Sequence, residues 1–92
     1  MTLPFPEEAR IRIAALYRLQ WEDSQQAYVL LYPEGMVKLN SSAGEILRRC
    51  DGTRTAAEII ADLKRAFPGA DLEDDVLNLL GAARDNGWIT AD

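Results

Sequence analysis

The sequence contains no histidine, and Cys50 is the single cysteine among its 92 residues. Histidine is the commonest general base and the commonest metal ligand in proteins. Zinc, iron–sulfur and haem sites are therefore disfavoured, and we expect no metal ion and no organic cofactor. One cysteine cannot form an intramolecular disulfide, which agrees with a reducing, cytoplasmic location.

Long apolar runs and a targeting pattern are also missing. No stretch approaches the roughly 18 apolar residues that a membrane-spanning helix needs. Residues 1–6, MTLPFP, lack the basic region followed by an apolar region that marks a secretory signal. We therefore expect a cytoplasmic protein without a membrane partner.

Positive charge is scarce, because ten Lys and Arg residues face fifteen Asp and Glu residues, for a formal net charge of −5. Binding to a nucleic-acid duplex requires basic side chains that neutralise several phosphates, so this balance counts against a nucleic-acid partner. The sequence has 48% hydrophobic and 27% charged residues. This composition, in a chain of 92 residues, predicts one small globular domain.

Three strands are predicted in the first half of the chain. Residues 16–21 and 36–40 alternate between apolar and polar side chains, as half-buried strands do. Residues 27–32 form a continuous apolar run, which suits a central strand. The two connections are short, so an antiparallel meander is expected, with the first and third strands at its edges.

Three helices are predicted in the second half. Ser42 and Thr55 each stand three positions before a glutamate, which is the capping-box pattern of a helix start. Residues 51–52, Asp-Gly, are expected to end the first helix. A third helix is expected to begin near Asp71 and to close at residues 86–87, Asn-Gly. Strands followed by helices predict an α+β class.

Residues 1–15 form a segment whose order the pattern leaves open. Residues 10–13 alternate like a strand, whereas residues 7–15 also suit a helix. We treat residues 1–15 as an N-terminal arm, either mobile or used as an oligomer contact, and residues 16–92 as one domain. Two sheet edges and this arm keep a homodimer open as a further partner.

Several short motifs occur in one order along the chain. They are LLYPEG at residues 30–35, Leu-Asn at 39–40, Ile-Leu at 46–47, Asp-Gly at 51–52, Asp-Val at 75–76 and Gly-Trp-Ile at 87–89. Each is weak alone, but their joint order resembles the PqqD family of pyrroloquinoline quinone (PQQ) biosynthesis. The resemblance covers roughly residues 16–89.

The resemblance implies a winged-helix-like fold, that of the recognition domains in pathways that modify ribosomally made peptides. It implies binding of a precursor peptide, PqqA, and association with the radical-SAM enzyme PqqE, which crosslinks a Glu and a Tyr within that peptide. In this family the leader peptide lies between the third strand of the sheet and the third helix. The protein would then be a peptide chaperone and not an enzyme.

The residues themselves also predict a groove. An edge strand offers unpaired backbone groups to which an extended peptide can add. On the third helix a second apolar seam runs beside the core stripe, and Gly81 next to it would let a peptide come close. The predicted walls are Met36, Val37, Lys38 and Leu39 on the strand, and Leu77, Leu80, Gly81 and Arg84 on the helix.

Simpler interpretations stand beside this prediction. Leu80 also suits plain core, and Leu77 also suits a stray exposed leucine. A small winged-helix DNA-binding module is one alternative function, although it would need a basic outer helix face. An acidic carrier protein is the other, because Asp23-Ser24 matches the dipeptide that carries a phosphopantetheine arm. In carriers that serine opens a helix, whereas here a turn is expected.

Overall fold

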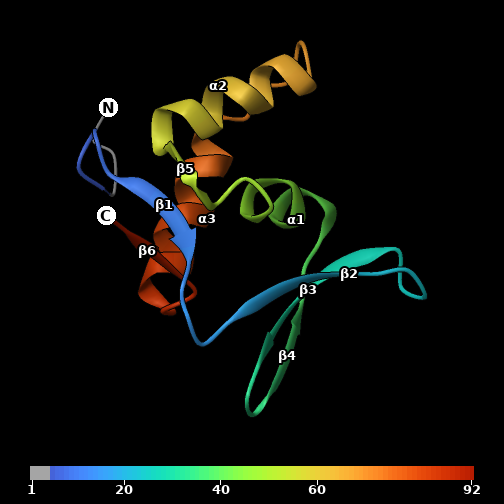
Figure 1. Cartoon of the computed structure of the whole chain (residues 1–92). Helices are drawn as coiled ribbons and strands as arrows, with labels where there is room; N and C mark the ends of the chain where they lie inside the picture. Colours follow the sequence, from blue (N-terminus) through green and yellow to red (C-terminus); the bar gives the residue numbers. More distant parts are fainter. Residues whose placement is uncertain (1–4) are drawn as a thin grey trace.

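Residues 5–92 are the part of the chain that the computed structural model describes, and they form six strands and three helices (Figure 1). The strands are β1 (Arg10–Ile13), β2 (Arg18–Glu22), β3 (Ala27–Tyr32), β4 (Gly35–Lys38), β5 (Asp51–Thr55) and β6 (Ile89–Ala91). The helices are α1 (Ser41–Leu47), α2 (Ala56–Ala66) and α3 (Glu73–Asp85).

The predicted meander is confirmed as the sheet β2-β3-β4. Strand β3 has the expected bounds and pairs antiparallel with β2 on one side and with β4 on the other. The α+β class, with a three-stranded antiparallel sheet and three helices, is also confirmed. The winged-helix likeness stays a prediction.

A second sheet, β5-β1-β6, was not predicted. Its central strand β1 comes from residues 10–13 and pairs antiparallel with both neighbours. The segment left open by the sequence therefore contributes a strand, while residues 1–4 lie outside the described residues. Strand β5, with the sequence DGTRT, has no apolar side chain and β6 has only three residues, so neither shows the alternation of a half-buried strand.

The start and end of α1 correct the prediction. Asn40, not Ser42, caps this helix, because the Asn40 side-chain oxygen accepts a hydrogen bond from the Ala43 N–H at 2.7 Å. The helix ends at Leu47, four residues before Asp51, and residues 51–55 form β5 instead of a helix stop.

The boundaries of the other two helices follow local chemistry. The predicted capping box of α2 is confirmed, with the Glu58 N–H bonded to the Thr55 hydroxyl and the Thr55 N–H bonded to the Glu58 carboxylate. Helix α3 closes as predicted. The Gly87 N–H bonds the Arg84 carbonyl at 3.0 Å, the Trp88 N–H bonds the Ala83 carbonyl at 2.9 Å, and Gly87 has φ +76°.

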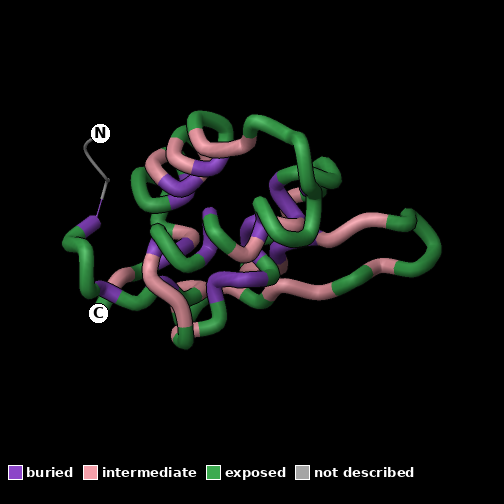
Figure 2. The backbone as a smooth tube through the Cα atoms, turned by 90° about the horizontal axis from the view of Figure 1, so that it is seen from above, coloured by how far each residue is buried: buried purple, intermediate pink, exposed green. Residues whose placement is uncertain are grey.

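The hydrophobic core lies where the three helices meet β1 and β6, and the buried residues concentrate there (Figure 2). Ile11, Ile59 and Leu80 have no exposed surface. Helix α1 also lies close against β3, because a methyl group at Gly44 would come within 2.8 Å of the Tyr28 ring. Among residues 5–92 no helix combines the length and apolarity needed to cross a membrane.

Candidate functional site

The outer edge of β4 carries backbone groups that the sheet leaves unpaired. The Leu39 N–H donates to the Tyr28 carbonyl at 3.0 Å, so residues 28 and 39 form a hydrogen-bonded pair. Hydrogen-bonded pairs alternate along an antiparallel ladder, so the backbone of Val37 also faces β3. The N–H and C=O groups of Met36 and Lys38 therefore point away from β3, toward the edge.

The side chains of the predicted strand wall alternate across the sheet. Val37 packs against the core cluster and Leu39 is a buried core residue. Met36 is 49% exposed, and Lys38 is exposed as well. Since Met36 and Lys38 lie on the face opposite Val37, the four residues present two different faces to a partner.

Two charged residues on the side of α3 that carries the predicted helix wall contact other parts of the protein than β4. Glu73 lies 3.8 Å from Lys64 on α2, and the Arg84 guanidinium lies 5.7 Å from the centre of the Phe5 ring. Of the predicted helix wall, Arg84 therefore contacts the segment before β1, while Glu73, one turn before Leu77, contacts α2.

The other members of that wall differ in how much surface they offer. Leu77 is partly buried against the core. Leu80 has no exposed surface, so it can support a groove only from beneath. A side chain at Gly81 would meet nothing within 4 Å, so the space beside it is open.

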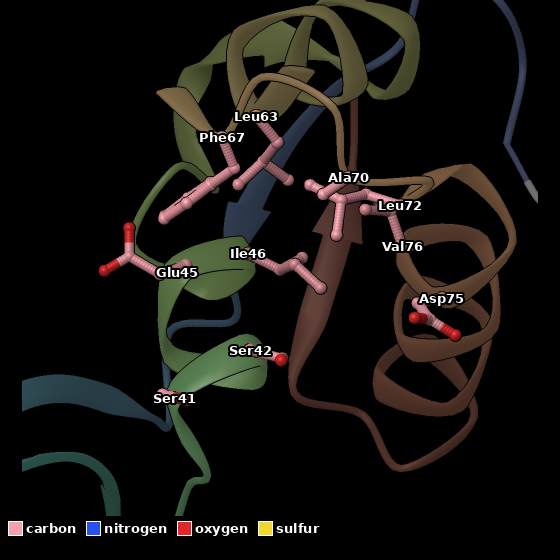
Figure 3. A pocket seen from close by; sticks show the side chains of 10 residues that line it. All are labelled: Ser41, Ser42, Glu45, Ile46, Leu63, Phe67, Ala70, Leu72, Asp75 and Val76. Carbon is pink, nitrogen blue, oxygen red and sulfur yellow. The ribbon is translucent and has the colours of Figure 1, made fainter. Parts of the chain in front are cut away.

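A pocket of about 300 Å³ opens between α1, the end of α2 and the start of α3, and the sequence analysis did not predict it. Its apolar side chains point toward one another, while the carboxylates of Glu45 and Asp75 lie at opposite rims (Figure 3). The lining residues are Ser41, Ser42, Glu45, Ile46, Leu63, Phe67, Ala70, Leu72, Asp75 and Val76.

The pocket and the β4 edge are separated by only a few residues in the sequence. Ser41 and Ser42 line it and follow Lys38, the last residue of β4, by only three and four positions. One mark of the pocket is visible only in the structure. Phe67 stays 42% exposed at the end of α2, which is unusual for an aromatic side chain on an apolar stripe.

A buried arginine fixes one wall of this pocket. The Arg49 side chain donates to the Asp62 carboxylate of α2 at 2.6 Å and to the Glu45 carboxylate of α1 at 2.9 Å. These hydrogen bonds hold the pKa values of both carboxyl groups below their ordinary range. Asp75, at the opposite rim, makes no ion pair within the described part of the chain.

Cys50 does not contribute a reactive thiol to this region. It is 2% exposed, and burial raises its pKa to about 12. A thiol with so high a pKa is almost fully protonated near neutral pH and is a poor nucleophile.

Comparison with known proteins agrees with the motif resemblance. The family model described as coenzyme PQQ synthesis protein D (PqqD) matches residues 27–89. A relative from Azotobacter vinelandii, named PqqA binding protein, is 54% identical over 74 residues, which are 79% of this chain and 80% of the relative. A protein of the same name from Methylococcus capsulatus is 44% identical over 79 residues, covering 86% and 85%.

Solved structures share the fold. The PqqD truncation of Methylobacterium extorquens PqqCD, a recognition element for ribosomally made, post-translationally modified peptides, matches with a TM-score of 0.74. Its identity is 24%, and the match covers 94% of each chain. The heterocyclase TruD matches with a TM-score of 0.70 and 19% identity, over 91% of this chain and 12% of TruD. The family match and these relatives place the chain in the family of coenzyme PQQ synthesis protein D.

Proposed function

We propose that this protein binds a PqqA precursor peptide by adding it as a fourth strand at β4, and that it presents the peptide to a radical-SAM enzyme of the PqqE type without doing chemistry itself. The relatives named PqqA binding protein support the identity of the peptide. The observation that carries the proposal is the β4 edge, where the backbone groups of Met36 and Lys38 face away from β3.

The backbone of β4 supplies only part of the affinity. Met36 and Lys38 together offer two donors and two acceptors, so an antiparallel peptide can form up to four hydrogen bonds. Each bond contributes a net of about 0.5–1.5 kcal/mol, or about 2–6 kcal/mol in total. A micromolar complex needs about 8 kcal/mol, so side-chain contacts must supply the remainder.

The side-chain contacts follow the predicted groove. Met36, Val37, Lys38 and Leu39 form the strand wall in this proposal, and Leu77, Gly81 and Arg84, with Leu80 beneath, form the helix wall. An added strand places alternate side chains on the core side of the sheet, where the helices lie.

A pair of substitutions at Lys38 tests strand addition. Lys38→Pro removes one outward N–H, which an edge strand tolerates, and its ring obstructs an incoming strand. Lys38→Ala is the matched control, because it removes the same side chain but keeps the N–H. Fluorescence anisotropy with labelled PqqA should show a loss of binding of at least tenfold for Lys38→Pro relative to Lys38→Ala. Equal affinities would exclude strand addition at β4.

Presentation to the enzyme needs a separate measurement. PqqE activity is followed as the Glu–Tyr crosslink formed in PqqA, detected by mass spectrometry, with and without this protein. We expect crosslinking to rise with the parent protein and to stay at the basal level with Lys38→Pro. A rate that does not respond to the parent protein would contradict a role in presentation.

The two alternative functions receive no support from the described residues. Ser24 lies in the turn between β2 and β3, whereas the serine of a carrier protein opens a helix. On α2, hydrogen bonds from Thr55 lower the pKa of Glu58, and Asp62 is bonded to Arg49. The two acids Glu58 and Asp62 offset the two bases Lys64 and Arg65 on this helix, so it offers no net positive charge to DNA phosphates.

A further inference from the structure

We infer that the pocket between α1, α2 and α3 is the anchor site of the peptide, and that it takes one bulky apolar side chain flanked by a basic residue. This inference rests on the proposed function, and it adds which kind of peptide sequence the protein selects.

The shape and lining of the pocket suit a single side chain. Its volume of about 300 Å³ stands at the lower end of the range for small-molecule sites, about 300–1,000 Å³. The deepest lining residues, Ile46, Leu63 and Val76, are 5%, 2% and 1% exposed. Phe67 stands at the mouth with 42% of its surface exposed, so an apolar guest would remove further apolar surface from water.

The pocket continues the line of β4. The strand ends at Lys38, and Ser41 already lines the pocket. Three residues of extended chain advance about 10 Å. A peptide that pairs with β4 and extends about three residues beyond Lys38 is therefore long enough to reach the level of Ser41.

The charges at the rim select the flanking residue. Glu45 is neutralised by Arg48 and Arg49, at 3.3 and 2.9 Å. Asp75 has no such partner among residues 5–92, whereas Glu73 on the same helical turn is paired with Lys64 at 3.8 Å. A Lys or Arg beside the anchoring side chain would meet the charge of Asp75 favourably, whereas an acidic neighbour would be repelled.

The test uses four variants of the whole protein and labelled PqqA. Phe67→Ala removes one wall and Ser42→Trp fills the mouth from an exposed helix position, and each should weaken binding about tenfold. Asp75→Asn should weaken binding about two- to fivefold at low salt and less at high salt. Asp74→Asn is the matched control, because it removes a charge from the same turn but does not line the pocket. Circular dichroism confirms that each variant is folded.

The location of the guest side chain is tested from the peptide side. Each large apolar residue of PqqA is replaced by Ala, and each peptide is titrated against the parent protein and Phe67→Ala. One replacement should weaken binding to the parent about tenfold and have little further effect on Phe67→Ala, since partners in contact are not additive.

The outcomes separate the anchor site from strand addition. If Lys38→Pro abolishes binding while Phe67→Ala, Ser42→Trp and Asp75→Asn bind like the parent, the anchor site is wrong and strand addition stands. If Asp74→Asn weakens binding as much as Asp75→Asn, the selection of a basic neighbour at the rim is refuted. If the parent protein does not bind PqqA, both proposals fail.

Discussion

Gly44 determines how closely α1 can approach the sheet, and its replacement by Ala gives the sharpest test of the packing described above. The added methyl group would lie 2.8 Å from Cδ2 and 3.3 Å from Cβ of Tyr28, closer than van der Waals contact allows. A shift of the Tyr28 ring is opposed by its packing against the core and by its contact with the Trp21 ring, at a centroid distance of 5.1 Å.

Two effects of opposite sign decide the outcome at Gly44. Ala stabilises a helix interior by about 1 kcal/mol relative to Gly. Overpacking a tight contact costs about 1–3 kcal/mol. We therefore expect Gly44→Ala to destabilise the protein by about 1 kcal/mol, which corresponds to a melting temperature about 4–8 °C lower in a domain of this size.

Gly81 is the matched control for the assay. It also lies inside a helix, but a methyl group there would meet nothing within 4 Å. Gly81→Ala should therefore raise the melting temperature by a similar amount, measured by circular dichroism. In a Tyr28→Leu background the clash is relieved, and Gly44→Ala should become neutral or stabilising. If Gly44→Ala raised the melting temperature of the parent protein as Gly81→Ala does, the close contact between α1 and β3 would be wrong.

Three further predictions follow from single residues. Cys50, with its pKa raised to about 12 by burial, should resist iodoacetamide at pH 8 in the folded protein and react in denaturant, and fast alkylation of the folded protein would contradict its burial. The pKa values of Glu45 and Asp62 are depressed in the folded state, so their stabilisation is complete above the ordinary values of 4.5 and 3.8 and is lost as the pH falls through the lower folded values. The melting temperature should therefore fall with acidification in this range, and less steeply in Arg49→Met; parallel curves for the two proteins would argue against the Arg49 network. Gly81→Gln should weaken PqqA binding if the helix wall includes this side of α3, and unchanged affinity would remove Gly81 from the site.

Local patterns in the sequence were sufficient for much of the helical half and for one sheet. The apolar run at residues 27–32 is β3 with the same bounds, because Val29 and Leu30, which point to opposite faces of the strand, are both buried. The Thr55–Glu58 pair caps α2, and Gly87 ends α3. At these two helix ends the deciding hydrogen bonds join residues at most five positions apart, so a local stretch of sequence contains all the groups involved.

The site was only partly predictable. The edge position of β4 followed from the meander, and its outward backbone groups follow from the pairing with β3. The sequence did not predict which side of α3 borders the pocket. A helix with apolar residues on more than one face can pack against the core in more than one orientation. Leu72 and Val76 border the pocket with α1, whereas Glu73 and Arg84 contact α2 and Phe5.

By itself the sequence determined which segments form the meander and where α2 and α3 are capped or closed, since these depend on neighbouring residues and on the period of apolar side chains. Only the tertiary structure decided that residues 10–13 pair with both β5 and β6, that Asn40 caps α1, and that the three helices leave a pocket between them. These features join residues far apart in the chain or depend on competition between two nearby caps. Their free energy comes from contacts that exist only once the whole domain has packed.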